Sequence, residues 1–259
     1  MNDLVSIITP TFNSADFIEE TILSVQKQTH QNWEMLITDD CSTDQTVDMI
    51  KTYTKADNRI KLFQLKENSG PAVARNNSIQ KAIGRFHAFL DADDLWLPEK
   101  LELQIQIIDN NKADICHGSY VIIDEYSRSS HIKVSAIPNL SFKKLRKNNY
   151  IGNLTGIYDA YKLGKIYNPF IKKRQDWGLW LNALDKSNYN SIGIDQTIAK
   201  YRVHKNSISN NKFDLLKYNF IVYHKCLKFS YIKSLYFMVL FLFEYFFVRP
   251  KFISKIENS

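Results

Sequence analysis

The first 110 residues alternate between short β-branched runs and longer amphipathic segments, and this alternation constrains the fold more than any other feature. It predicts strands over 4–9, 33–40, 60–65 and 85–91, and helices over 16–28, 43–53, 71–83 and 98–109. Strands joined through a helix pair in parallel, and helices then cover both faces of the sheet. We therefore expect an α/β fold with a Rossmann-like, mostly parallel central sheet.

After residue 110 the alternation weakens. The sequence there predicts a hairpin of strands over 115–124 and 129–136, a helix over 176–186, short strands within 191–204, and further helices from 213 onward.

Acidic residues gather after two of the predicted strands. Asp39 and Asp40 follow the second strand, and Asp91, Asp93 and Asp94 follow the fourth. Because parallel sheets bind ligands at the carboxyl ends of their strands, we expect these five carboxylates in one crevice. They repel one another unless a cation offsets their charge, and oxygen ligands favour Mg²⁺ or Mn²⁺. The alternative is that they cap the helices that follow.

Charge is unevenly distributed along the chain. Residues 1–141 hold 13 basic and 20 acidic side chains, residues 142–174 hold nine and one, and residues 212–259 hold eight and three. A nucleic-acid-binding protein is expected to be basic over its binding domain, so the acidic front argues against one. The pattern suits a cation site in the first half and an anionic partner or membrane surface in the second.

The cysteines and the first residues bear on the compartment. Cys41, Cys116 and Cys226 lie far apart, which argues against a disulfide scaffold and a cysteine zinc site. The first twelve residues lack the basic and apolar regions of a signal peptide. The sequence therefore predicts a cytoplasmic protein.

Six segments, in this order, resemble glycosyltransferase family 2. They are VSIITPTFNSADFIEETILSVQKQT (5–29), ITDDCSTDQT (37–46), NSGPAVARNNSI (68–79), FLDADDLWLPEKL (89–101), RQDWGLWL (174–181) and YRVHKNSIS (201–209). The resemblance implies the GT-A nucleotide-diphospho-sugar transferase fold. It implies a catalytic domain over 1–211, with a nucleotide and metal half (1–110) and an acceptor half (111–211). A helical C-terminal segment over 212–259 follows.

The resemblance also assigns the nucleotide site. Thr9, Pro10 and Phe12 line the base and ribose. Asp40 accepts the uracil N3–H, a polar contact that selects uridine because a base without this donor leaves a buried carboxylate unpaired. Arg75 meets the diphosphate. The alternative for Arg75 is a solvated helix residue.

The metal is assigned to the Asp91-Ala92-Asp93 element, which is similar to the family's DxD element. Asp93 contacts Mn²⁺ or Mg²⁺, and Asp91 holds the ribose or a metal-bound water. His204 resembles the late histidine that reaches the metal or the diphosphate. The alternative for His204 is a structural role.

The catalytic base of the resemblance is Asp176, where Gln175 replaces the Glu of the family's Glu-Asp motif. A carboxylate there removes the proton from the acceptor hydroxyl. The alternative for Asp176 is a helix N-cap. Arg174 and Trp177 are the acceptor candidates. The alternative for Arg174 is a solvated basic loop, and the alternative for Trp177 is core packing.

The function implied is an inverting, metal-dependent transfer of one sugar, glucose or galactose, from a UDP-sugar. The acceptor is an undecaprenyl-diphosphate-linked GlcNAc or GalNAc, with a β-1,3 linkage, in O-antigen or capsule synthesis. The alternatives are a UDP-N-acetylhexosamine transferase and a non-catalytic membrane-associated scaffold of the same fold. The chain lacks the QxxRW pattern of processive synthases, and it lacks the GxGxxG of a dehydrogenase.

The most unusual composition lies in residues 230–252, an aromatic and apolar run flanked by lysines and Arg249. Glu244 interrupts the run, which leaves less than the ~20 apolar residues of a bilayer span. We expect a helix that lies on the cytoplasmic face of the inner membrane. The alternatives are a homodimer interface and packing on the catalytic domain.

Overall fold

The computed structural model describes residues 3–110, 113–204 and 212–256, the first three of the last range by backbone alone. Residues 205–209 of the last family-like segment, and the predicted domain boundary at 211, lie outside the described residues.

Four parallel strands form the first half of the central sheet. They are β1 (Val5–Thr11), β2 (Trp33–Asp39), β3 (Ile60–Gln64) and β4 (Phe86–Phe89), in the spatial order β4-β1-β2-β3. Every residue of β1 and β2 is buried, as expected for central strands covered on both faces. The predicted mostly parallel, Rossmann-like first half is confirmed.

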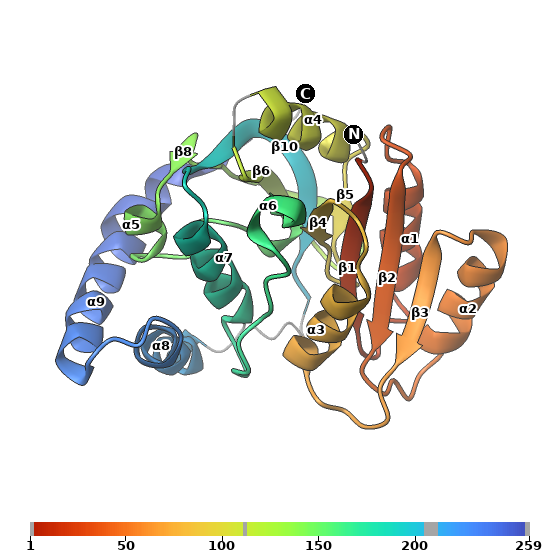
Figure 1. The fold of residues 1–259 in the computed structure, drawn as a ribbon, viewed down its shortest axis with the longest axis horizontal. Coiled ribbons are helices and arrows are strands. Elements are labelled where there is room, and N and C mark those ends of the chain that lie inside the picture. The colour runs from red at the N-terminus through yellow and green to blue at the C-terminus, as the bar shows by residue number, and fades with distance from the viewer. Residues whose placement is uncertain (1–2, 111–112, 205–211, 257–259) are drawn as a thin grey trace.

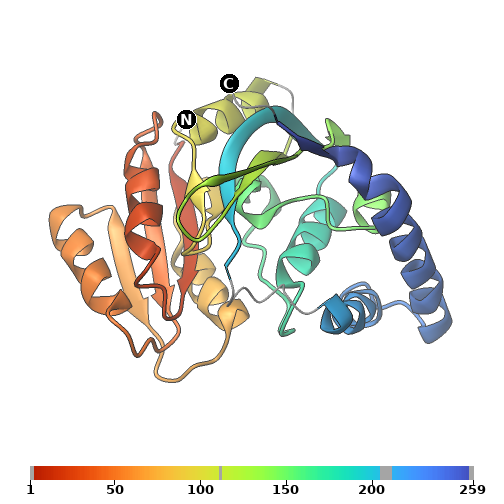
Figure 2. The ribbon, with the colours of Figure 1, turned by 180° about the vertical axis from the view of Figure 1, so that it is seen from behind.

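Helices cover both faces of these strands (Figures 1 and 2). Helices α1 (Ile18–Gln26) and α2 (Thr46–Ala56) lie on one face, and α3 (Pro71–Lys81) lies on the other. Pro71 occupies the first turn of α3, where its missing N–H costs nothing. Gly70 precedes it at φ 89°, a left-handed conformation that glycine adopts without strain.

The second half extends the same sheet with antiparallel strands. Strand β9 (Ile157–Asp159) joins β4 to β6 (Ile115–Ile123), and β6 forms the predicted hairpin with β7 (Ser129–Val134). Strand β10 (Ser191–Arg202) lies parallel to β6. The predicted series of short strands is wrong here, because register shifts after Ile194 and Thr197 keep one 12-residue strand paired.

The remaining short elements connect these strands. They are β5 (Leu95–Trp96), α4 (Lys100–Asn110), β8 (Asn139–Leu140), α5 (Phe142–Leu145), η1 (Asn153–Thr155), α6 (Ala160–Leu163) and α7 (Gln175–Lys186). Strands β5 and β8 both pair with β10. The buried side chains form two clusters, to which the neighbouring residues Ile7 and Ile8 contribute from opposite faces of the sheet.

The C-terminal segment is helical, as predicted, and it packs on the preceding part of the chain (Figure 1). It comprises α8 (Lys212–Ile221), η3 (Val222–Cys226), α9 (Tyr231–Phe243), η4 (Glu244–Val248), η5 (Arg249–Phe252) and β11 (Ile253–Lys255). Phe237 and Phe241 are buried in the same cluster as Trp177. Strand β11 pairs with β7 at the edge of the sheet.

Candidate active site

The carboxyl ends of β1 and β2 are joined through Asp40. Its N–H donates to the Thr11 carbonyl at 2.8 Å. Its two carboxylate oxygens accept the N–H groups of Ser69 at 2.7 Å and Gly70 at 2.8 Å. Asp40 is buried and fixes the turn from which α3 begins. Each oxygen keeps acceptor capacity for a ligand.

Asp39 has a local role, but it does not cap the helix that follows, because the N-cap of α2 is Gln45. Its carboxylate accepts the N–H of Ser42 at 3.0 Å and the Ser42 hydroxyl at 2.5 Å. Asp39 thus closes the turn that follows β2, whereas Asp40 reaches across to α3.

The residues predicted to line the nucleotide differ in burial. Thr9 and Pro10 are buried, so they form the floor of this end of the sheet. The Thr9 hydroxyl has no hydrogen-bond partner among the described residues. Phe12 is 46% exposed at the end of β1, where its ring is available to a ligand.

Arg75 on α3 joins the loop after β4 to the start of α7. One guanidinium nitrogen donates to Asp91 at 2.7 Å and another donates to the Gln175 side-chain oxygen at 2.9 Å. Burial opposes the charge of Arg75, but the carboxylates of Asp91, Asp176 and Asp93 outweigh it and raise its pKa. Arg75 is therefore a buried cation between three carboxylates, and the solvated-helix alternative is wrong.

The loop after β4 concentrates negative charge. Burial and the charge of Asp91 raise the pKa of Asp93, and burial with both neighbouring carboxylates raises that of Asp94 well above its usual range. Asp93 is bonded to His204, whose Nε2 lies 3.0 Å from its carboxylate. The His204 ring also packs on Phe17, with 5.0 Å between ring centroids. Asp93 and His204 therefore come together as predicted.

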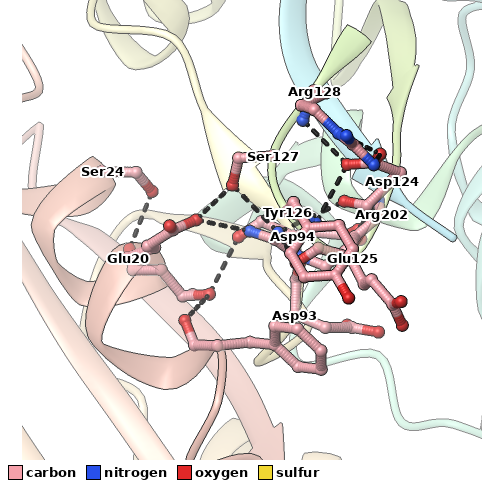
Figure 3. Close-up of polar contacts among 12 residues, drawn as sticks. Glu20, Ser24, Asp93, Asp94, Asp124, Glu125, Tyr126, Ser127, Arg128 and Arg202 are labelled. Carbon is pink, nitrogen blue, oxygen red and sulfur yellow. Dashed lines mark hydrogen bonds and ion pairs between the residues drawn. The ribbon is translucent and has the colours of Figure 1, made fainter. Parts of the chain in front are cut away.

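Arg202 at the end of β10 fixes the shape of this loop (Figure 3). Its side-chain Nε donates to the Asp93 carbonyl at 2.7 Å, and its backbone N–H donates to the Asp94 carboxylate at 2.9 Å. The guanidinium also reaches Glu20 at 2.6 Å and the Ser127 hydroxyl at 2.9 Å. This fully buried cation offsets carboxylate charge and holds the loop backbone.

Asp176 lies in the first turn of α7, beside Asn149. The N-cap of α7 is Arg174, at φ 65°, so the predicted N-cap alternative for Asp176 is wrong. The Asp176 carboxylate accepts a hydrogen bond of 2.7 Å from the Asn149 amide. Gln175, the preceding residue, links to Arg75, and so the start of α7 faces the Asp91–Asp94 loop.

The structure corrects the assignment of Trp177 to the acceptor. Trp177 is fully buried, its indole N–H donates to the Leu145 carbonyl at 2.9 Å, and its ring packs on Tyr223. Trp177 is therefore a core residue, and the core-packing alternative is confirmed. Arg174 is half-buried, and its guanidinium has no hydrogen bond or ion pair with any described residue.

The donor set fits a divalent cation that is shared with a ligand. Within 3–110, 113–204 and 212–256, no group of three or more acidic, histidine or cysteine side chains forms a complete metal cage. A metal that bridges phosphate oxygens needs only one or two protein ligands. The Asp93 carboxylate and the His204 imidazole could supply such ligands, and the three carboxylates of the loop favour a cation nearby.

The sequence profile of Glycosyl transferase family 2 matches residues 6–167, which is more than half of the chain. The chain belongs to this family. It is a glycosyltransferase, and the enzyme class predicted from the sequence is confirmed.

Two relatives match over most of their lengths. WfgD of Escherichia coli, named a UDP-Glc:alpha-D-GlcNAc-diphosphoundecaprenol beta-1,3-glucosyltransferase, is 42% identical over 83% of each chain. TuaG of Bacillus subtilis (strain 168), whose name assigns it to teichuronic acid biosynthesis, is 39% identical over 89% of this chain and 91% of its own. These family 2 relatives include enzymes of bacterial polysaccharide synthesis.

The fold matches solved structures of other proteins. S. aureus TarS 1–349 in complex with UDP-GlcNAc aligns with a TM-score of 0.72 at 22% identity, over 93% of this chain and 73% of that one. The mannosyltransferase PcManGT of Pyrobaculum calidifontis, solved with GDP-Man and Mn²⁺, aligns with a TM-score of 0.68 at 17% identity, over 95% and 71%. The predicted GT-A fold is confirmed.

Sequence reasoning missed Asn149 and Arg202, which hold Asp176 and the Asp93 loop. Arg202 stands two residues before His204 at the end of a strand, and this position was the available signal. Asn149 lies in a loop with no periodic pattern, so nothing in the sequence marked it.

Proposed function

We propose that this family 2 enzyme transfers one sugar, glucose or galactose, from a UDP-sugar to a lipid-diphosphate-linked GlcNAc or GalNAc, with inversion and with a divalent metal. The observation that carries the proposal is the link through Arg75. Its guanidinium binds both Asp91 and Gln175, which brings the predicted base Asp176 beside the predicted metal loop.

The donor half of the reaction rests on residues at the carboxyl ends of β1, β2 and β4. Phe12 offers its ring to the uracil, and Asp40 offers a buried carboxylate to the uracil N3–H. Asp93 and His204 would hold Mn²⁺ or Mg²⁺, and Asp91 would hold the ribose or a metal-bound water. A bound cation there supplies positive charge to the leaving diphosphate.

The chemical step rests on Asp176 and Arg75. Asp176 takes the proton from the acceptor hydroxyl as the hydroxyl oxygen bonds to the anomeric carbon of the sugar. The bond from that carbon to the diphosphate breaks on the opposite face, and the electron pair leaves with UDP. Arg75 stabilises the developing charge as a preorganised cation. Attack from the opposite face converts an α-linked donor to a β-linked product.

The choice of donor and acceptor draws on the relatives. WfgD and a second Escherichia coli relative, WfaP, which is 35% identical over 82% of each chain, are both named as UDP-Glc-dependent β-1,3-glucosyltransferases acting on GlcNAc-diphosphoundecaprenol. The half-buried Arg174 beside Asp176 suits an acceptor that carries phosphate.

The proposed setting is the cytoplasmic face of the inner membrane, in O-antigen or capsule synthesis. The helical run Tyr231–Phe252 has a mean hydropathy of 1.6, and by length and composition it could also cross a bilayer. One side of it is buried against protein at Phe237, Phe241 and Glu244, while the other side exposes apolar residues. A one-sided helix supports attachment in the plane of the membrane rather than a span.

A donor screen tests the proposal. UDP-glucose, UDP-galactose and UDP-GlcNAc are offered with a synthetic lipid-diphosphate GlcNAc or GalNAc, with Mn²⁺ and with EDTA, and product linkage is read by NMR. We expect a β-1,3-linked hexose that EDTA abolishes. Transfer from UDP-GlcNAc would establish the N-acetylhexosamine alternative, and no UDP release with any donor and acceptor would establish the scaffold alternative.

A further inference from the structure

Arginines from three separate elements gather on the side of Asp176 that faces the C-terminal helices. Arg146 is the C-cap of α5, Arg174 precedes α7, and Arg249 begins η5. The Tyr223 hydroxyl donates to the Arg146 carbonyl at 2.8 Å, and the charges of Arg174 and Arg146 both act on that hydroxyl. Burial and the charge of Arg249 lower the pKa of Arg174, whereas Asp176 raises it. The three cations therefore share one neighbourhood.

Two of these guanidinium groups each have one buried nitrogen without a hydrogen-bond partner among the described residues. The Nε atoms of Arg146 and Arg174 are buried, and neither side chain forms a hydrogen bond or an ion pair with the part of the chain that the structure describes. Arg146 lies over the rings of Phe142 and Phe237, 5.1 and 5.2 Å from their centroids. Buried guanidinium nitrogens without partners are costly, and an anion would satisfy them.

The other charged groups nearby are already paired. Lys144 and the Tyr150 hydroxyl donate to the buried carboxylate of Glu244. Arg249 donates to the Asn148 side chain at 3.0 Å and to the Asn149 carbonyl. Among these described groups, four cations (Lys144, Arg146, Arg174 and Arg249) face the two carboxylates of Asp176 and Glu244. This neighbourhood therefore has more positive than negative side chains, and the described cations whose side chains lack a hydrogen-bond partner are Arg146 and Arg174.

We propose that Arg146 and Arg174 form the binding site for the diphosphate of the acceptor, an inference that rests on the proposed function. Arg174 is two residues from the base, and Arg146 packs on Phe237 of α9. The base, the two arginines and the apolar helix α9 therefore follow one another in the same order as the sugar, the diphosphate and the lipid of a lipid-linked sugar diphosphate. Each phosphate of such a diester carries one ionised oxygen, and the planar guanidinium fork matches phosphate oxygens.

The first test compares two acceptors. Arg146→Gln, Arg174→Gln and the double variant are assayed with a lipid-diphosphate GlcNAc and with an uncharged alkyl glycoside of GlcNAc. We expect the KM for the diphosphate acceptor to rise about tenfold or more for each variant, because each loses a charge-assisted hydrogen bond. The KM for the glycoside stays unchanged. Lys143→Gln, which removes an exposed cation from α5, is the matched control.

The second test needs no activity. Inorganic pyrophosphate is titrated into the full-length protein saturated with UDP, so that the donor site is occupied. We expect binding to the wild type and to Lys143→Gln, and at least tenfold weaker binding to the double variant. Absence of binding to the wild type, or equal binding to the double variant, would overturn the inference.

A phospholipid headgroup is the other source of the same chemistry. Sedimentation with phosphatidylglycerol vesicles is therefore compared for the wild type and the double variant, and we expect equal binding. Loss of vesicle binding with an unchanged acceptor KM would overturn the acceptor site in favour of a lipid site. If pyrophosphate binding depends on the arginines but no lipid-diphosphate sugar accepts a sugar, the anion site stands and the proposed function fails.

Discussion

The side-chain amide of Asn149 donates a hydrogen bond of 2.7 Å to Oδ2 of Asp176. The same loop is held from the C-terminal segment, because Arg249 bonds to the Asn148 side chain and to the Asn149 carbonyl. The predicted base is thus oriented by a loop that a distant part of the chain supports.

Replacing Asn149 by Ala removes the group that orients Asp176. A hydrogen bond to a charged group contributes ~1.5–3 kcal/mol, so we expect kcat to fall roughly 10- to 100-fold while the KM for the donor stays constant. Initial rates at varied UDP-sugar concentration measure both values. Asn190→Ala, on an exposed loop, is the control. An unchanged kcat would show that Asn149 does not position the base.

Arg202→Lys keeps the charge at the end of β10 but loses the fork that holds Asp93, Glu20 and Ser127. Residues that orient metal ligands typically affect metal affinity ~10- to 100-fold, so we expect weaker Mn²⁺ binding in that range. Electron paramagnetic resonance of free Mn²⁺ measures it. Arg128→Gln, whose side chain is exposed, is expected to bind as the wild type does. Equal affinity in Arg202→Lys would contradict a role for Arg202 at the metal loop.

Two buried histidines predict a stability loss in weak acid. Burial with the charge of Lys165 lowers the pKa of His87 to about 4, and burial alone lowers that of His117 to about 4. The unfolded chain takes up these protons near pH 6.5, so between pH 6.5 and 4 it binds more protons than the folded chain. Stability therefore falls as pH falls through this window, by at most about 1.4 kcal/mol per pH unit for each histidine.

Urea unfolding between pH 7 and 4.5 measures this slope. His117→Gln removes one titrating group, and we expect a flatter dependence on pH than in the wild type. His131→Gln replaces an exposed histidine and serves as the control. Parallel curves for the wild type and His117→Gln would refute the assignment.

The outward side of α9 and η4 predicts membrane attachment. Phe243 and Phe247 are 56% and 64% exposed, and their rings contact each other, with 5.2 Å between centroids. Because each buried aromatic side chain contributes ~1.5–3 kcal/mol, the double variant Phe243→Ser/Phe247→Ser should bind anionic vesicles at least tenfold more weakly. Activity on an uncharged soluble acceptor should persist.

Ile83→Ser, which changes an exposed apolar residue outside the C-terminal segment, is the control for this experiment. Vesicle binding that survives in the double variant would defeat attachment through this face. A change from dimer to monomer in the same variant would identify the face as an interface between two copies.

The parts of the site that sequence could predict are those tied to regular elements. Asp40 and Asp91 follow fully buried strands, so their place at the carboxyl ends of the sheet follows from the alternation. The Asp93–His204 pair joins residues 111 positions apart, and only the family resemblance linked them before the structure did.

The parts that sequence could not predict depend on tertiary packing. An aromatic residue in the first turn of α7 is equally compatible with a sugar platform and a core, and only the packing of Tyr223 and Phe241 against Trp177 decides. Likewise, the unpartnered Nε atoms of Arg146 and Arg174 result from tertiary packing, such as that of Arg146 on Phe237 of α9, which no local pattern encodes.

The most direct test of the account is the product formed by Asp176→Asn. Single-turnover transfer from UDP-glucose to a lipid-diphosphate GlcNAc is measured with Mn²⁺, UDP affinity is measured by titration, and the anomeric configuration is read by NMR. We expect a β-linked product from the wild type, a loss of rate on the order of 10²–10⁴-fold in the variant, and unchanged UDP affinity. A variant that transfers at the wild-type rate, or a wild-type product with the α configuration, would contradict the assignment of Asp176 as the base of an inverting transfer.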